Sequence, residues 1–179
     1  MNIPNVLTLL RILLVPVTVI FLMQGAFLKA LIALFISGIT DALDGFLARI
    51  LNQQTVLGAY LDPIADKALI VSCFVTMSIK SIIPGWFTVI VISRDVIILL
   101  GIAILSIMSI PYEIRPSFIG KVTTTLQLSM IFFSLVFRIL PGSIDHVWLI
   151  VLQWTTILFT VASGLDYMFR GIKLNSKPA

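Results

Sequence analysis

Long apolar stretches alternate with short polar breaks along this chain. Stretches of about 20 residues, the length that crosses a hydrocarbon core, can be placed near 5–23, 28–49, 58–79, 86–108, 118–139 and 146–169. Breaks fall at Gln24-Gly25, Asn52 to Thr55, Lys80 to Gly85, Pro111 to Pro116 and Pro141 to Asp145. The stretches are too long and continuous for barrel strands, whereas helices satisfy their own backbone hydrogen bonds in lipid. The pattern predicts an all-α integral membrane protein, a bundle of six transmembrane helices forming one domain over residues 1–179.

Composition supports a membrane protein over a soluble one. Hydrophobic residues make up 59% of the chain and charged residues only 11%, whereas a soluble domain carries roughly a quarter charged residues. The net charge of +4 comes without a basic run or interleaved surface aromatic residues, which argues against nucleic acid as a partner. A lipid bilayer and an anionic substrate fit this charge better.

The distribution of Lys and Arg predicts the orientation in the membrane, because cytoplasmic loops carry an excess of positive charge. With six spans, both termini lie on one side. That side holds six basic residues: Arg49, Arg115, Lys121, Arg170, Lys173 and Lys177. The opposite side holds three: Lys29, Lys80 and Arg138. We therefore expect a multi-pass protein, in the inner or plasma membrane if bacterial, with both termini in the cytoplasm.

Four carboxylates stand out in the apolar second and third stretches. Asp41 and Asp44 are spaced i,i+3, and Asp62 and Asp66 are spaced i,i+4, so each pair projects from one helix face. An ionised group in lipid costs at least ~2.5 kcal/mol, which makes such acids functional candidates. Mg²⁺ and Mn²⁺ prefer carboxylate oxygens and bridge them to substrate phosphates. The pattern predicts a metal site at the cytoplasmic boundary, with Asp66 as a metal ligand or proton acceptor.

Small residues continue the acidic face and indicate what the metal binds. Gly45 and Ala48 follow Asp41 at i+4 and i+7, and Gly58 lies one turn before Asp62. Backbone left bare by small side chains admits a bulky polar group, and Arg49 can clamp a phosphate with two hydrogen bonds. An internal ion-pair network and a cation transporter, in which intramembrane acids relay ions, are alternatives. The transporter explains the acids but not the small residues.

The residues from Asp41 to Asp66 resemble the signature of the CDP-alcohol phosphotransferase family. They match the pattern D-x2-D-G-x2-A-R-x8-G-x3-D-x3-D at every position and spacing, and six membrane helices are also that family's plan. The stretches Asn2 to Arg11 and Leu61 to Lys67 look similar to the subgroup that uses CDP-diacylglycerol. That subgroup makes phosphatidylglycerol phosphate and, in its eukaryotic-type branch, cardiolipin.

The resemblance implies a mechanism and a set of residue roles. An acceptor hydroxyl, deprotonated by the last acid, attacks the β-phosphorus of CDP-diacylglycerol, and CMP leaves while two metal ions spread the developing charge. Carried over to this chain, the metal ligands are Asp41, Asp44, Asp62 and Asp66, with Asp66 also the base. The residues facing the cytidine diphosphate are Asp41, Asp44, Gly45, Ala48, Arg49 and Gly58. Family members are commonly homodimers.

The sequence leaves two acceptor alcohols open. Basic residues that can bind an anionic acceptor are Arg94, Arg115, Lys121 and Lys67. They suit glycerol 3-phosphate, the leading candidate, and equally phosphatidylglycerol, which yields cardiolipin. The stretch Ser93 to Val96 departs from the Arg-Glu pair typical of phosphatidylglycerol phosphate synthases and looks closer to cardiolipin synthases. Two roles are open for Arg94. In the first, it binds the acceptor phosphate while Asp95 orients a neighbouring basic group. In the second, it pairs with another helix and has a structural role only.

Overall fold

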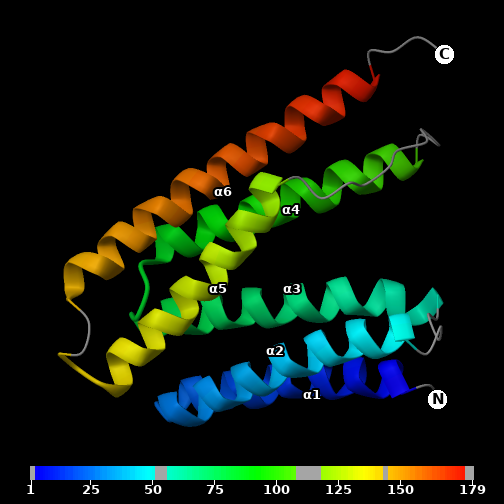
Figure 1. The fold of residues 1–179 in the computed structure, drawn as a ribbon. Coiled ribbons are helices and arrows are strands. Elements are labelled where there is room, and N and C mark those ends of the chain that lie inside the picture. Colours follow the sequence, from blue (N-terminus) through cyan, green and yellow to red (C-terminus); the bar gives the residue numbers. More distant parts are fainter. Residues whose placement is uncertain (1–2, 51–55, 108–117, 143–144, 176–179) are drawn as a thin grey trace. The chain divides into compact units, whose positions relative to one another are not determined.

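The chain forms six helices in the part that the structure describes (Figure 1). In this computed structural model the backbone is described for residues 3–50, 56–107, 118–142 and 145–175, and side chains for 8–41, 43, 64–101, 118–142 and 145–169. The helices are α1 (Ile3–Met23), α2 (Phe27–Ile50), α3 (Val56–Ile79), α4 (Gly85–Ile107), α5 (Phe118–Ile139) and α6 (His146–Asn175). The prediction of an all-helical protein is confirmed, and the helix ends lie close to the predicted ones except at the end of α6.

The end of α6 differs from the prediction. The apolar stretch ends at residue 169, yet the helix continues to Asn175. The difference has a simple physical reason. A drop in hydropathy marks the end of the apolar part of a segment. A helix, however, ends only where its backbone hydrogen bonding stops. Hydropathy alone therefore underestimates the length of a helix that runs on into a polar segment.

A left-handed residue ends α1 and turns the chain toward α2. Gly25 has a φ of +73°. Its N–H donates to the carbonyl of Leu22 at 3.1 Å, and the N–H of Ala26 donates to the carbonyl of Phe21 at 2.9 Å. This pair of bonds is the Schellman motif, which satisfies carbonyls at a helix end and favours glycine at its left-handed position.

The same motif ends α3, but with a serine at the left-handed position. Ser81 has a φ of 53°. Its N–H donates to Ser78 at 2.9 Å, and the N–H of Ile82 donates to Met77 at 2.8 Å. A residue with a Cβ is strained in this conformation. The tight turn from α3 into α4 is therefore formed at some cost in stability.

The described chain divides into two compact units. The first contains residues 1–83 and 134–141, and the second contains residues 84–133 and 142–179. In the first unit α1 packs against α2 and against α3. Ala30 and Ala33 are buried on α2, and such small side chains let neighbouring helices approach closely. Leu69, Phe74 and Met77 bring buried apolar side chains from α3.

In the second unit α4 packs against α6. The hydroxyl of Thr123 on α5 shares its one hydrogen between two carbonyls, that of Phe159 on α6 at 3.0 Å and that of Ile119 within its own helix at 2.8 Å. A hydroxyl bonded to backbone carbonyls, as in Thr123, needs no water, which suits the interior of a membrane protein. The rings of Trp86 on α4 and Trp154 on α6 lie 5.7 Å apart and form a second contact between helices of this unit.

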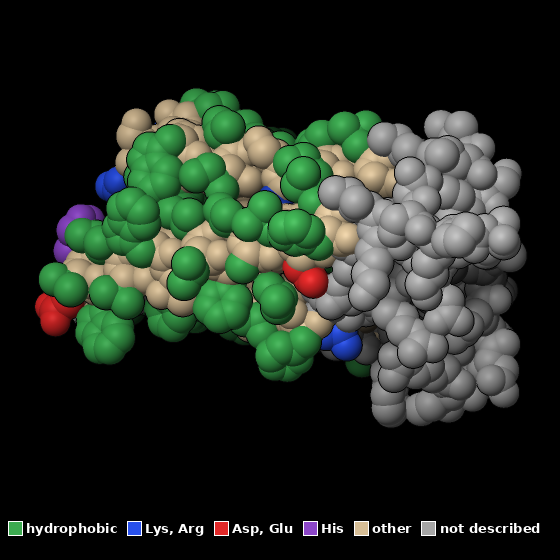
Figure 2. All heavy atoms as spheres, turned by 90° about the horizontal axis from the view of Figure 1, so that it is seen from above, with side chains coloured by type: hydrophobic (Ala, Val, Ile, Leu, Met, Phe, Trp, Pro, Cys, Tyr) green, Lys and Arg blue, Asp and Glu red, His purple; other side chains and the backbone are tan. Residues whose placement is uncertain are grey.

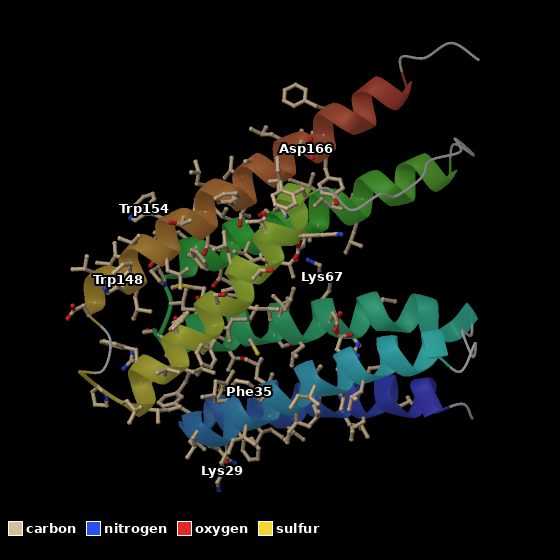
Figure 3. The ribbon with its side chains drawn as sticks, viewed as in Figure 1. Lys29, Phe35, Lys67, Trp148, Trp154 and Asp166 are labelled. Atoms are coloured by element: carbon tan, nitrogen blue, oxygen red, sulfur yellow. The ribbon has the colours of Figure 1, made fainter. Side chains whose placement is uncertain are left out.

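Large apolar side chains cover the outer faces of the helices. Exposed examples include Leu13 on α1, Phe35 on α2, and Leu158 and Phe169 on α6. Figure 2 shows hydrophobic side chains over most of the described part of the face it displays, and Figure 3 labels Phe35, Trp148 and Trp154 among the side chains on the helices. Exposed apolar surface of this extent indicates contact with lipid or with another protein.

Two helices meet the length and composition expected of a membrane span, Phe118–Ile139 and His146–Phe169, when only the described residues are considered. Thr8–Met23 forms a shorter apolar helix. The other predicted spans stay predictions, as does the single domain over residues 1–179.

Candidate active site

Three charged side chains meet within the first unit, each from a different helix. Arg11 on α1 lies between Asp41 on α2 and Asp66 on α3. Its Nη2 is 2.8 Å from Oδ1 of Asp41, and its Nη1 donates to Oδ1 of Asp66 at 3.0 Å. One guanidinium group therefore connects the first and the last acid of the sequence motif.

The buried face of α1 explains why Arg11 points between α2 and α3. Thr8, Arg11, Thr18 and Leu22 are buried along α1, whereas Leu13 on another face is exposed. Their spacing forms one stripe along a helix, and α1 packs against both α2 and α3. The arginine thus occupies a position that belongs to the inner face of the unit.

Burial differs sharply between the cation and the two acids. The Arg11 side chain is 0% exposed, whereas the side chains of Asp41 and Asp66 are 50% and 44% exposed. A buried charge is tolerated only where it is paired and hydrogen-bonded, and the two carboxylates meet that need. The guanidinium therefore lies on the interior side of the two acids, which keep exposed surface.

The remaining residues of the motif lie on the same two helices. Asp44, Gly45, Ala48 and Arg49 belong to α2, and Gly58 and Asp62 belong to α3. Their side chains lie outside the described ones, so the roles predicted for them stay predictions. What the structure does bring together is Asp41 and Asp66, which are far apart in sequence and share one arginine.

The donor chemistry of this site fits a hard divalent cation. Asp41 and Asp66 offer carboxylate oxygens close to one another and partly exposed, and such oxygens are the ligands that Mg²⁺ and Mn²⁺ prefer. Within the described side chains, no group of three or more His, Cys, Asp or Glu residues gathers as a metal site. The predicted ligand set also includes Asp44 and Asp62, which lie outside that search.

The candidate acceptor-binding residues fall in different parts of the chain. Lys67 directly follows Asp66 on α3 and is partly buried (Figure 3). Lys121 is exposed on α5, and Arg94 is buried on α4. Arg115 lies outside the described residues. Lys67 belongs to the first unit, with the acids, and Lys121 and Arg94 belong to the second.

Arg94 is engaged by neighbours within the second unit. Its Nη1 donates to Oδ1 of Asp95 at 2.7 Å, and its Nη2 donates to the hydroxyl of Ser163 on α6 at 2.6 Å. The ring of Tyr167 lies with its centroid 5.8 Å from the guanidinium carbon. Asp95 therefore orients Arg94 itself, although neighbours on a helix diverge by about 100°. These contacts favour a role in joining α4 to α6, and acceptor binding by Arg94 stays a prediction.

Arg11 is the residue whose role the sequence reasoning did not predict. It entered only as part of the stretch Asn2 to Arg11 that resembles the CDP-diacylglycerol subgroup. A signal was present nevertheless, because a charged side chain within an apolar helix is rare and usually faces a partner or a cavity. Which residues Arg11 contacts depends on how α1 packs against α2 and α3, and this packing cannot be predicted from the spacing of residues in the sequence.

Comparison with known proteins places this chain in a family. The family described as CDP-alcohol phosphatidyltransferase matches residues 1–163. A probable phosphatidylglycerophosphate synthase of Mycobacterium tuberculosis is 37% identical, over 96% of this chain and 82% of its own length. The rat enzyme called cardiolipin synthase (CMP-forming) is 33% identical, also over 96% of this chain.

A third relative, from Aquifex aeolicus, is called CDP-diacylglycerol–glycerol-3-phosphate 3-phosphatidyltransferase and is 29% identical over 97% of this chain and 98% of its own length. The chain spans 62% of the length of the rat enzyme. Given a family match over nearly its whole length, this chain belongs to the CDP-alcohol phosphatidyltransferase family.

Proposed function

We propose that this protein transfers the phosphatidyl group of CDP-diacylglycerol to an alcohol and releases CMP, with glycerol 3-phosphate as the leading acceptor. The observation that carries the proposal is the pairing of Asp41 and Asp66 on Arg11, in a chain of this family. These two residues begin and end the acid motif, and they contribute partly exposed carboxylates from neighbouring helices. Arg11 pairs with both acids, yet each carboxylate keeps about half of its surface exposed and so stays accessible to a metal ion and a phosphate.

The donor is bound by the residues of the motif. Asp41, Asp44 and Asp62 would hold divalent cations, Mg²⁺ or Mn²⁺, with Asp66 at the second of two ions. Such ions would stabilise the charge that develops on the attacking and leaving oxygens. Arg49 contributes further positive charge toward the diphosphate. The small residues Gly45, Ala48 and Gly58 leave space along α2 and α3 for the cytidine diphosphate.

Asp66 accepts the proton in the transfer step. The acceptor hydroxyl gives its proton to the Asp66 carboxylate, and its oxygen forms a bond to the β-phosphorus of CDP-diacylglycerol. The bond from that phosphorus to the oxygen bridging to CMP breaks, and CMP leaves with the electron pair. The partial exposure of Asp66 supports this role, because a general base must reach the hydroxyl that it deprotonates.

The acceptor carries a phosphate in either of the leading cases. Glycerol 3-phosphate gives phosphatidylglycerol phosphate, and phosphatidylglycerol gives cardiolipin. Relatives with both kinds of name align with 96% of this chain or more, which makes cardiolipin synthesis the second candidate. Lys67, Lys121, Arg94 and Arg115 are the basic residues proposed to bind the acceptor phosphate. Of these four residues, Lys67 is the one that directly follows Asp66 on α3.

The reaction takes place at a membrane surface in this proposal. The exposed apolar faces of the helices support six membrane spans, with the acyl chains of the donor entering sideways from the bilayer. Both termini and the acid motif lie on the cytoplasmic side, as the excess of Lys and Arg there favours. Two copies of the chain form a homodimer, as is common in the family.

A product assay on purified protein tests the proposal. CDP-diacylglycerol and Mg²⁺ or Mn²⁺ are supplied with glycerol 3-phosphate, with phosphatidylglycerol, or with no acceptor, and CMP and the lipid product are identified by mass spectrometry. We expect acceptor-dependent CMP release with phosphatidylglycerol phosphate as product. Cardiolipin as the product would select the second candidate. Absence of CMP release with either acceptor would overturn both.

A further inference from the structure

We infer that Arg11 is a positioning residue, which fixes the carboxylates of Asp41 and Asp66 relative to each other and thereby sets the affinity of the site for its divalent cation. The inference rests on the proposed function, because it assigns Arg11 a role in the same site. It concerns a residue outside the acid motif, on a different helix from either acid.

The geometry of the three side chains carries the first step. Two different nitrogens of one planar guanidinium reach two carboxylates, at 2.8 Å to Asp41 and 3.0 Å to Asp66. Because the two N–H groups are held at a fixed angle, each carboxylate is oriented by the same rigid group. A lysine at this position has a single ammonium nitrogen on a flexible stem and cannot impose the same relative orientation.

The burial of Arg11 decides between two roles for the cation. In one, the guanidinium merely replaces a metal ion and leaves when the metal binds. In the other, it stays in place behind the acids. Arg11 is 0% exposed, and moving it away from the acids would break two ion pairs of a buried charge, which is strongly unfavourable. The structure therefore favours an arginine that stays in place.

The exposure of the two acids gives the third step. Asp41 and Asp66 are 50% and 44% exposed, so a ligand approaching from solvent meets the side of the carboxylates away from Arg11. Groups that hydrogen-bond to metal-binding side chains from behind orient them for the metal, and their removal typically weakens metal binding by about 10–100-fold. Arg11 contacts both acids from behind in this way.

The chain also provides a matched control for a purely structural role. Nζ of Lys80, just after α3, donates to the carbonyl of Met23, the last residue of α1, at 3.0 Å. This contact also connects α1 with the α3 segment, but it lies at the C-terminal end of α1 and is exposed. Lys80→Met therefore removes a tie between the same two segments without touching the acids.

Binding of Mn²⁺ alone, measured by electron paramagnetic resonance on purified protein without lipid donor or acceptor, tests the inference. We expect Arg11→Lys to weaken Mn²⁺ binding by about 10–100-fold, whereas Lys80→Met leaves the affinity unchanged. Mn²⁺ binding by Arg11→Lys within twofold of the unmodified protein would overturn the inference, as would an equal loss in Lys80→Met. If Arg11→Lys does not fold, Arg11→Gln serves in the same comparison, since it removes the buried charge and keeps a donor for one carboxylate.

The same measurement separates this inference from the proposed function. An unmodified protein that binds no Mn²⁺ would overturn the metal-dependent function and this role together. Binding by the unmodified protein that is indifferent to Arg11 would overturn the role of Arg11 alone and leave the proposed function standing.

Discussion

The carboxylate of Asp66 accepts a hydrogen bond from the buried guanidinium of Arg11 at 3.0 Å, while its side chain stays 44% exposed. An aspartate held from the interior and open on its other side has a fixed orientation toward an incoming hydroxyl. General-base catalysis depends on that geometry as much as on proton affinity. Among single residues, the proposed transfer therefore depends most on the Asp66 side chain.

Replacing Asp66 with asparagine removes the proton acceptor and changes the side-chain volume little. We expect Asp66→Asn to reduce phosphatidyl transfer by about 10²–10⁴-fold, the usual contribution of a general base, while CDP-diacylglycerol binding in the presence of Mn²⁺ is largely retained. CMP release and donor binding, measured on the same preparation, check this. Full transfer activity in Asp66→Asn would exclude Asp66 as the base.

At the scale of whole helices, the ends of α1 and α3 form a natural comparison. Both close with the same pair of backbone hydrogen bonds, but the left-handed position holds Gly25 after α1 and Ser81 after α3. We expect Ser81→Gly to stabilise the protein by about 1 kcal/mol, because glycine avoids the steric cost of this conformation. Thermal unfolding in detergent measures the change. Gly25→Ser is the matched control and should destabilise by a similar amount, and a lower melting temperature for Ser81→Gly would contradict this.

A buried arginine on α4 forms an ion pair within its own helix and a hydrogen bond to α6. Arg94 bonds to Asp95 beside it and to Ser163 on α6, with both charged residues buried. Because Arg94→Ala removes the ion-pair partner of a buried carboxylate, we expect it to cost about 3–5 kcal/mol of stability. Arg138→Ala is the control, since Arg138 is exposed and its bond to the Ser81 carbonyl is long, at 3.4 Å. Chemical unfolding that shows equal effects for the two variants would contradict the role given to Arg94.

For the whole molecule, the membrane orientation is the prediction with the widest consequences, because it decides from which side water-soluble substrates arrive. Cys73 is the only cysteine of the chain and is buried, so Cys73→Ser provides a background for single-cysteine labelling. With both termini cytoplasmic, Lys29→Cys should react with a membrane-impermeant maleimide in intact cells. Lys121→Cys should react only in inverted vesicles. Labelling of the two positions from the same side would contradict the six-span arrangement.

The helices were largely predictable from the sequence for a physical reason. A helix in lipid must satisfy its own backbone hydrogen bonds and present apolar side chains over a fixed length. Its extent can therefore be predicted from the local composition of the sequence. Gly25 marks the end of α1 as glycine commonly does. Ser81 gave no such signal, because serine is not a residue that favours a left-handed turn, and the end of α6 was missed because polarity alone does not stop a helix.

The acids of the site were predictable from the sequence, whereas the residues that contact them were not. Asp41 and Asp66 draw attention because ionised groups are costly in an apolar chain, and their spacing within each pair is local. The partner that joins them is 55 residues away from Asp66, and Arg94 and Ser163 are separated by 69 residues. Contacts of this kind arise from helix packing, which sequence spacing does not encode.

In the proposed function, the acids of α2 and α3 carry out a metal-dependent phosphatidyl transfer. The most direct test measures acceptor-dependent CMP release from CDP-diacylglycerol over a Mn²⁺ titration, in the unmodified protein and in Asp41→Asn. We predict that chelation abolishes CMP release by the unmodified protein and that Asp41→Asn is impaired at least about 10²-fold, with saturation shifted to higher Mn²⁺, because it loses a charged metal ligand. CMP release that is indifferent to chelation, or retained in full by Asp41→Asn, would contradict the account.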